Sequence, residues 1–246
     1  MTARINNQRA WLLHHRPFRD SSMIIDFFSH DYGLVTLIAR GSRSQKSKLK
    51  GILRPFLPLD ISWIKKTDLG TLTGAELNGD PIALKGEALL SAYYINELML
   101  NLLHRDDSQV EMFSTYTSTI KNLCAFNYNL AILRVFEIRM LELLGYGLNF
   151  QYEAKTGKEI EKEMFYQYII DEGPVFSKSN NGPMIFSGEE LIAIGSHDFS
   201  NPLTLKNAGR LLRPIITNRI GGKELKSRKV LKGMRKVMSV NIEGVS

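Results

Sequence analysis

Short apolar segments, rich in β-branched and aromatic residues, fill the first eighty positions of the chain, and turn-forming residues separate them. One of them is apolar on both faces, because Ile24 and Phe28 alternate with Ile25 and Phe27. This indicates a strand with one face in a barrel interior and the other on a packed or ligand-contacting surface. The pattern predicts five strands, at residues 9–15, 23–29, 33–41, 59–66 and 71–77.

The longest connection falls between the third and fourth strands, which is typical of a small five-stranded barrel of the OB type. From Ile82 the apolar positions recur at helical spacing instead. The pattern predicts a first helix after Ile82, a second over 110–125, and a third over 130–145. The third is apolar almost all round, as a central bundle helix is, and ends at Gly145 and Gly147.

The remainder mixes turns with shorter elements. Residues 151–186 carry several turn signals and are expected to be irregular. Ser187 and Glu190 form a capping box that predicts a helix start, and a last helix follows, kinked or broken at Pro214. The predicted fold class is therefore α+β, with an N-terminal five-stranded OB-fold barrel (1–80) followed by an α-helical C-terminal domain (81–246).

Composition narrows the class of protein only moderately. The 246 residues are 43% hydrophobic and 23% charged, as in ordinary globular proteins. No apolar run is long enough for a membrane span, and the first residues lack a secretory signal, so a cytoplasmic protein is expected. The single cysteine, Cys124, excludes an internal disulfide and a cysteine-based zinc site, and fits a reducing compartment.

Positive charge is concentrated in two runs. The first, "RGSRSQKSKLKGILR" at 40–54, has six cations and no carboxylate, and the second, at 219–236, has eight cations and one acid. The rest of the chain holds 18 cations against 24 acids, although the net charge of the whole is +7. An acidic body with two basic runs is the pattern of a protein that binds polyanions. The alternative is a solvated loop and a solvated tail.

The basic runs are also built to contact phosphates, because Ser hydroxyls and backbone N–H groups donate to the same oxygens as Lys and Arg. The predicted DNA-binding residues are Arg40, Arg43, Lys46, Lys48, Lys50, Arg54, Lys223, Lys226, Arg228 and Lys229. Nearby aromatic residues can stack on bases, although most are expected in the core and one or two at most on a base. These are Trp11, Phe18, Phe28, Tyr32, Phe56 and Trp63.

Catalytic motifs are missing from the sequence. It has no phosphate-binding loop and no dinucleotide fingerprint. His14 and His15 would point to opposite faces of a strand, which is poor for joint metal ligation, and Cys124 is expected to be a small buried residue on an apolar helix face. We therefore expect no enzyme activity, no cofactor and no metal site.

Several segments together resemble a known family. The most specific is "ARGSRSQKSKLKG" followed by "LRPF"; "YYINELML", "LRVFEIRMLELLGYGLNF" and "GGKELKSR" follow in the same order. They are similar to RecO, the bacterial DNA-repair and recombination mediator of the RecF pathway. The resemblance implies an OB-fold, a helical domain and no turnover. It also implies binding to single- and double-stranded DNA, strand annealing, and cooperation with RecR in loading RecA onto DNA covered by single-strand-binding protein.

One departure from that family concerns zinc. Many RecO proteins carry four cysteines after the "LGY" motif, whereas "QYEAKTGKEIEKEMFYQY" has none here, so the resemblance is to the zinc-free type. The family also implies docking of the acidic, apolar C-terminal tip of single-strand-binding protein. Arg134 and Arg139 on the third helix suit that carboxylate, and the alternative is that they pair with Glu137 or Glu142. Of the two, Arg134 is preferred, because it matches the family's "LR.FE" motif.

Two other functions remain open from the residues alone. One is an RNA-binding or ribosome-associated OB-fold protein, because composition does not separate RNA from DNA. The other is an adaptor whose helical surface binds proteins while the basic runs only confer solubility. Only the family resemblance ranks nucleoid-associated DNA repair first.

Overall fold

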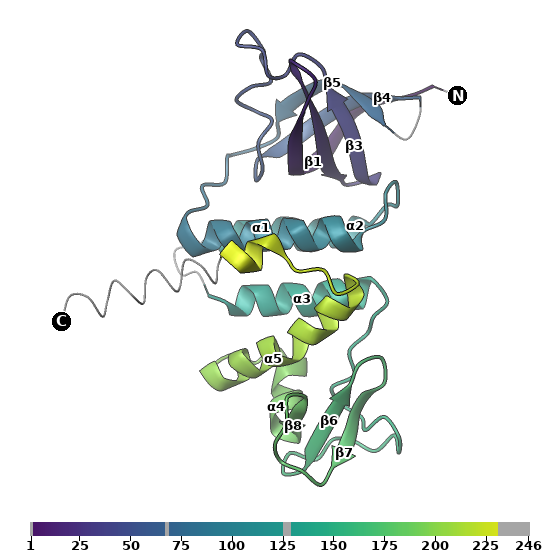
Figure 1. The fold of residues 1–246 in the computed structure, drawn as a ribbon, viewed down its shortest axis with the longest axis vertical. Coiled ribbons are helices and arrows are strands. Elements are labelled where there is room, and N and C mark those ends of the chain that lie inside the picture. The colour runs from purple at the N-terminus through teal and green to yellow at the C-terminus, as the bar shows by residue number, and fades with distance from the viewer. Residues whose placement is uncertain (1, 67–68, 125–128, 231–246) are drawn as a thin grey trace, which may run out of the picture. The chain divides into compact units, whose positions relative to one another are not determined.

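The computed structural model describes residues 2–66, 69–124 and 129–230, and it forms two compact units (Figure 1). The first unit comprises Met1–Tyr128 together with Glu224–Ser246, and the second comprises Asn129–Lys223. Packing therefore places residues 224–230 with the beginning of the chain. This grouping differs from a division of the chain at residue 80.

Five strands of the first unit close into a barrel in the order β1-β2-β3-β5-β4 (Figure 1). All neighbours are antiparallel except β3 and β5, which pair in parallel and so complete the ring. This order and the location of the longest connection confirm the predicted OB-type barrel. The strands are β1 (Ala3–Phe18), β2 (Ser22–Ser29), β3 (Gly33–Ala39), β4 (Pro58–Lys65) and β5 (Gly70–Leu77).

Strand β1 is longer than its apolar pattern indicates. Its second half pairs with β2 and its first half with β4, so one continuous strand contributes to two pairings. The pairing register shifts between Ile5 and Gln8, where Asn7 has a positive φ of 50°. Such an irregularity lets a strand bend around a small barrel. The polar segment before Arg9 concealed this half from the sequence pattern.

The interior of the barrel is filled from every strand. Ile25, Phe27, Leu37 and Ile61 are at most 1% exposed, and Trp63 lies among the same core residues. At about 25 cal/mol per Å² of apolar surface removed from water, this cluster supplies the main driving force for closing the barrel.

The second apolar face of β1 and β2 is covered by two helices, α1 (Gly86–Leu102) and α2 (Val110–Leu123). Trp11 packs edge-on against Tyr116 with ring centroids 5.8 Å apart, and Phe28 lies 5.4 Å from Phe113. The Trp11 indole N–H donates to Thr117 Oγ1 over 2.9 Å. Of the two alternatives for this face, packing is therefore the one observed. The helices belong to the barrel's unit because they bury its aromatic residues.

The second unit combines three helices with a small sheet. Its strands pair in the order β7-β6-β8, all antiparallel. Helix α5 packs on α3 and on α4. The elements are α3 (Ala131–Leu143), β6 (Phe165–Ile169), β7 (Gly173–Ser177), β8 (Ile185–Ser187), α4 (Gly188–Gly195) and α5 (Pro202–Arg219).

The expectations for this unit are corrected in part and confirmed in part. The segment 151–186 is only partly irregular, because β6 and β7 lie within it, β8 begins in it, and alternating residues such as Tyr166 and Tyr168 bury one face of the sheet. Of the two outcomes expected at Pro214, a break is wrong, since α5 runs through Pro214 as one element. The capping box is present: Ser187 Oγ accepts from the N–H of Glu190, whose carboxylate accepts from the N–H of Ser187. Within the described residues, no helix is long and apolar enough to cross a bilayer.

Candidate nucleic-acid interface

The connection between β3 and β4, residues 40–57, carries the first basic run and stands out from the barrel in Figure 1. Successive turns shape it, with the N–H of Ser44, Ser47 and Lys50 each donating to the carbonyl three residues earlier. All six predicted cations of this basic loop are exposed. They are Arg40, Arg43, Lys46, Lys48, Lys50 and Arg54.

Apolar residues between the cations and shortly after them fasten the basic loop to the barrel. Leu53 and Leu57 are 4% exposed and belong to the barrel core, and Leu49 and Ile52 pack against that core. Ser42 is buried and donates its hydroxyl to the Ala39 carbonyl over 2.8 Å. The loop therefore directs its cations outward from a fixed base. Because the base of the loop is already fixed, the loop loses less conformational entropy when a ligand binds.

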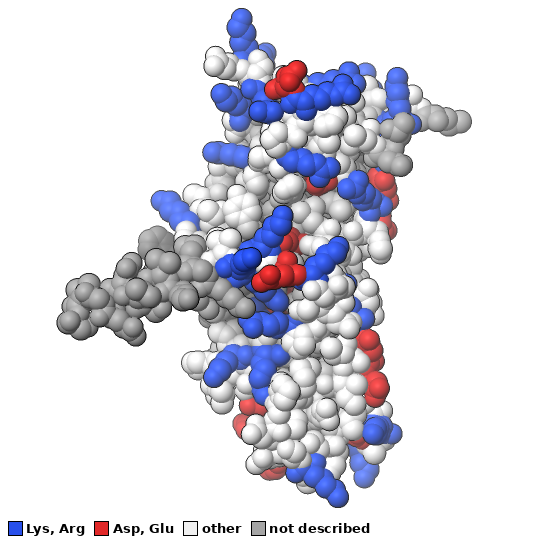
Figure 2. Space-filling model, in the orientation of Figure 1, with Lys and Arg blue, Asp and Glu red and all other residues white. Residues whose placement is uncertain are grey.

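The charges of the basic loop are not neutralised by carboxylates. In the described part of the chain, the recorded salt bridges include none of its six cations. Arg43 donates to the backbone carbonyl of Arg19 over 3.2 Å, a contact that leaves its charge intact. Lys and Arg also outnumber Asp and Glu on the barrel face in Figure 2. A phosphate backbone can therefore contact this surface without displacing an ion pair.

Most of the six candidate stacking residues are structural. Trp11, Phe28 and Phe56 are at most 4% exposed, and Trp63 lies in the barrel core. Tyr32 is 41% exposed and Phe18 is partly exposed. The expectation that most of the six lie in the core is therefore confirmed, and stacking of a base on Tyr32 or Phe18 stays a prediction.

The second basic run is divided between the units. Lys223 is the exposed last residue of the second unit, while Lys226 and Lys229 are exposed in the first. Arg228 is partly buried, with its guanidinium carbon 5.1 Å from the centre of the Tyr94 ring and a 2.8 Å hydrogen bond to the Tyr94 hydroxyl. Lys232, Arg235 and Lys236 of this run lie outside the described residues.

A carboxylate of α1 contacts the second run at its helical start. Glu97 accepts hydrogen bonds from the backbone N–H groups of Lys226 and Ser227, at 2.9 and 3.0 Å. Sequence analysis did not identify Glu97 or Tyr94 as functional. The sequence feature that could have indicated such a contact is Leu225, which directly precedes this helical turn. Leu225 has no side-chain oxygen to cap the turn, so a cap has to come from elsewhere in the chain.

Arg134 and Arg139, predicted to meet a partner's carboxylate, both pair within α3. Arg134 is 14% exposed and contacts Glu137 at 2.8 Å, and Arg139 contacts Glu142 at 3.0 Å. A Cβ at Gly209 of α5 would lie 3.3 Å from Arg134 Nη1, so this glycine leaves room for the guanidinium. Of the two alternatives left open by the sequence, pairing on the same helix is the one observed.

Comparison with known proteins assigns the family. The family model "Recombination protein O N terminal" matches residues 1–79, and "Recombination protein O C terminal" matches residues 84–229. The chain belongs to the RecO family. The DNA repair protein RecO of Nitrosococcus oceani is 40% identical over 240 residues, which cover 97% of each chain. That of Dechloromonas aromatica is 36% identical over 241 residues, covering 96% of this chain and 99% of the relative.

Membership of the RecO family establishes a role in DNA repair and recombination, and it raises the question of zinc. The described residues offer no group of three or more His, Cys, Asp or Glu side chains that could hold a metal ion. Cys124, the one cysteine, is exposed rather than buried as expected, because it ends α2 instead of facing the core. The residues described here do not fit the zinc site of other RecO proteins.

Glu153 organises the segment that follows the "LGYG" residues and contains no cysteine. Glu153 is 6% exposed, and its carboxylate accepts from the Thr156 hydroxyl and from the N–H groups of Thr156 and Phe176. The Thr156 hydroxyl lowers the pKa of Glu153 most, and the backbone N–H groups act in the same direction. The turn is thus held by a carboxylate that joins it to β7.

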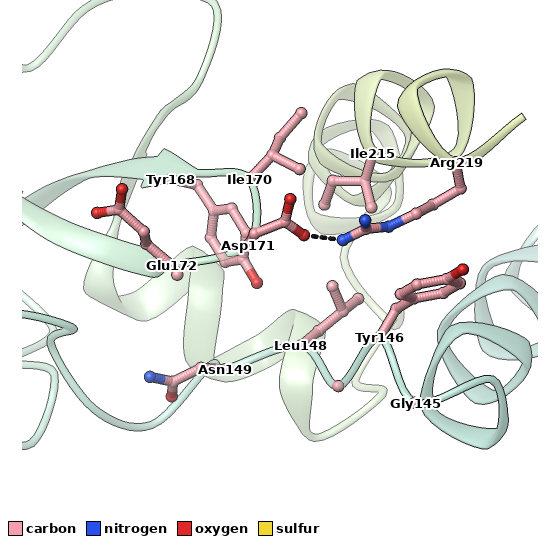
Figure 3. Close-up of a pocket in the computed structure, with 12 residues that line it drawn as sticks. Gly145, Tyr146, Leu148, Asn149, Tyr168, Ile170, Asp171, Glu172, Ile215 and Arg219 are labelled. Atoms are coloured by element: carbon pink, nitrogen blue, oxygen red, sulfur yellow. Dashed lines mark hydrogen bonds and ion pairs between the residues drawn. The ribbon is translucent and has the colours of Figure 1, made fainter. Parts of the chain in front are cut away.

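A pocket of about 180 Å³ lies beside the "LGYG" segment of RecO, between residues 145–149, the β6–β7 turn and the end of α5 (Figure 3). The Arg219 guanidinium lies 4.1 Å from the centre of the Tyr146 ring and pairs with Asp171. Burial raises the pKa of Tyr168, on the pocket wall, to about 12. Arg219 belongs to the second basic run by sequence, but its charge is used here to hold the loop that carries Tyr146.

Proposed function

We propose that this RecO protein binds single- and double-stranded DNA through the basic loop and the C-terminal basic segment (residues 224–230), and that it anneals complementary strands. We further propose that it works with RecR to load RecA onto DNA covered by single-strand-binding protein, in the cytoplasm at the nucleoid. The observation that carries the DNA-binding proposal is the set of six exposed loop cations, for which no salt bridge to a carboxylate is recorded among the residues that the structure describes. The family assignment supports the place of this binding in recombination.

Annealing requires positive charge and exchangeable contacts rather than a catalytic residue. Two complementary strands repel each other, and cations that contact both backbones lower this repulsion. Lys and Arg on an exposed loop release one phosphate and contact the next without a large barrier, because water replaces each lost contact. The bases then meet while the backbones remain bound. No cofactor is needed for this step.

The proposed contact with single-strand-binding protein involves α3. The acidic C-terminal tip of single-strand-binding protein would replace Glu142 as the partner of Arg139, which is 45% exposed. Replacing Glu137 as the partner of the mostly buried Arg134 would be less easy. An exposed ion pair contributes little to stability, so such an exchange costs little. Arg134 then supports the helix through Glu137 and contacts the tip only if that pair opens.

Neutralising the basic loop tests the DNA-binding proposal. A variant with Arg43, Lys46, Lys48 and Lys50 changed to alanine is expected to bind a fluorescent single-stranded oligonucleotide roughly a hundredfold more weakly at about 0.1 M salt. Its salt slope should shrink by about 3, since each single-strand phosphate contact contributes about 0.7. Unchanged affinity, with the fold intact by circular dichroism, would contradict the proposal.

The matched control changes the same number of exposed cations in the second unit: Lys155, Lys158, Lys162 and Lys178. It lowers the net charge equally, so a similar loss in both variants would indicate attraction by overall charge alone. Competition between DNA and RNA oligonucleotides of equal sequence addresses the RNA-binding alternative. Preference for RNA would favour that function, and no binding to either at moderate salt would favour the adaptor.

A further inference from the structure

Helix α1 contacts both basic segments of the first unit at adjacent positions. Phe56, at the end of the basic loop, packs edge-on against Tyr93 with ring centroids 5.0 Å apart. The next residue, Tyr94, holds Arg228 of the C-terminal segment. Glu97, one helical turn beyond Tyr93, contacts the same segment. One helix therefore joins two cationic segments that are far apart in sequence.

Glu97 binds the C-terminal segment through both carboxylate oxygens. Oε1 accepts from the N–H of Lys226 at 2.9 Å, and Oε2 accepts from the N–H of Ser227 at 3.0 Å and from its hydroxyl at 2.6 Å. These N–H groups belong to the first turn of the helical residues 226–230, where intrahelical acceptors are missing. A negative charge at this end is also favoured by the helix dipole.

The segment has no cap of its own. Helices normally begin after Ser, Thr, Asp or Asn, whose side-chain oxygen accepts from the first turn, but Leu225 occupies that position here. Leu225 is 3% exposed and Ser227 is 9% exposed, so the residues on this side face the unit. Lys226 and Lys229 are exposed on the other side. The contact with Glu97 thus fixes which side of the segment faces solvent.

The contacts also leave the positive charge of the segment available. Arg228 is held by the ring and hydroxyl of Tyr94, which are neutral. Glu97 binds N–H groups and a hydroxyl of the segment, and within residues 2–66, 69–124 and 129–230 its recorded partners include no Lys or Arg side chain. An acidic residue within a phosphate-binding surface would ordinarily oppose binding. Here its charge is directed at a helix end instead.

We propose that Glu97 is a positioning residue, which docks the C-terminal basic segment on α1 so that the segment and the basic loop form one composite site for a nucleic-acid backbone. Tyr94 assists by holding Arg228. This inference rests on the proposed DNA-binding function and adds to it a specific partner for the tail.

The test uses the full-length protein with Glu97→Gln and Glu97→Ala. Hydrogen exchange at the amides of Lys226 and Ser227 should become about tenfold faster in Glu97→Ala, as for the loss of a helix cap. Affinity for a single-stranded oligonucleotide should fall at least about threefold, and the salt slope should shrink by about 1 to 2 as two or three contacts are lost. Glu97→Gln, which keeps one acceptor oxygen, should show smaller changes in the same direction.

Glu76→Gln is the matched control, because Glu76 is an exposed carboxylate of the same unit on β5. Removing a negative charge alone strengthens DNA binding, so Glu76→Gln should bind slightly more tightly. Weaker binding in Glu97→Gln would therefore have the opposite sign to a pure charge effect. Circular dichroism and thermal unfolding of each variant verify that the barrel is folded.

The outcomes separate this inference from the proposed function. If Glu97→Ala binds DNA as tightly as the wild type or more tightly, while the basic-loop variant binds weakly, the positioning role is wrong and the DNA-binding function stands. If exchange at Lys226 and Ser227 does not change, the carboxylate does not hold the segment. If the basic-loop variant itself binds normally, the DNA-binding proposal fails independently of Glu97.

Discussion

The basic loop and the C-terminal basic segment are fastened to the same unit in different ways. The loop places its own Leu53 and Leu57 in the barrel core, within a few residues of the cations that they support. The C-terminal segment depends on Glu97, 129 residues away in sequence, and on Tyr94. The first support is apolar and local, whereas the second is polar and remote. We infer that the two segments should respond differently to mutation.

The largest expected effect is the loss of a local apolar support. Leu53→Ala should lower the free energy of unfolding by about 2–4 kcal/mol, because it leaves a cavity in the barrel core. Denaturant unfolding monitored by the fluorescence of buried Trp63 measures this change. Leu49→Ala, at a partly buried position of the same loop, is the control. An equal or larger loss in that control would show that Leu53 is not the main support.

The next effect distinguishes the two segments in DNA binding. Lys226→Ala with Lys229→Ala removes two exposed cations, so the salt slope should shrink by about 1.4 and the affinity should fall by roughly one decade. The basic-loop variant, which loses four cations, should lose about twice as much on a logarithmic scale. Fluorescence anisotropy titrations at several salt concentrations give both values. A tail variant that loses more than the loop variant would reverse the proposed order.

A smaller effect concerns the contact between the basic loop and α1. In a double-mutant cycle with Phe56→Leu and Tyr93→Leu, we expect a coupling energy of about 0.5–1.5 kcal/mol from the aromatic pair. Unfolding of the four proteins in denaturant measures it. A parallel cycle of Tyr93 with Phe18, whose ring lies under Arg19, should give a coupling near zero. Similar couplings in both cycles would argue against a specific contact.

The smallest effect extends the comparison to a carboxylate that acts locally. The pKa of Glu153 is lowered in the folded state, so its stabilising contribution is complete above its unfolded pKa and is lost as the pH falls through the folded pKa. Stability should therefore decrease below about pH 4.5, and Glu153→Gln should flatten this dependence. Thermal unfolding between pH 3 and 7, roughly, measures it. Exposed Glu163→Gln should retain the wild-type slope.

Much of the fold could be predicted because the spacing of apolar residues along the chain indicates which segments form strands and which form helices. Four of the five barrel strands were located to within about two residues, and the order of the elements followed from the change in period. The first half of β1 was missed, since its polar residues bind the barrel through backbone pairing rather than side-chain burial. The sheet β6–β8 was missed because its strands are only three to five residues long.

The parts of the candidate site that depend on neighbouring residues in the sequence could be predicted, and the parts that depend on distant residues could not. The loop cations had to be exposed, because no nearby carboxylate could compensate them if buried. The roles of Arg134 and Arg139 stayed open, since a glutamate on the same helix and an acidic partner protein both offer a carboxylate to an arginine. Glu97 gave no signal within its own helix, where a carboxylate suggests only a solvated position. Its meaning depends on Leu225, and tertiary structure alone brings the two together.

The aromatic residues under α1 and α2 have a practical consequence. A fragment ending at residue 80 would expose Trp11 and Phe28, which are at most 2% exposed in the intact unit. Contiguous apolar surface of that kind promotes self-association, so the isolated barrel should precipitate or form aggregates. The barrel is therefore unsuited to transplantation into another protein, and its smallest independent form has to retain both covering helices.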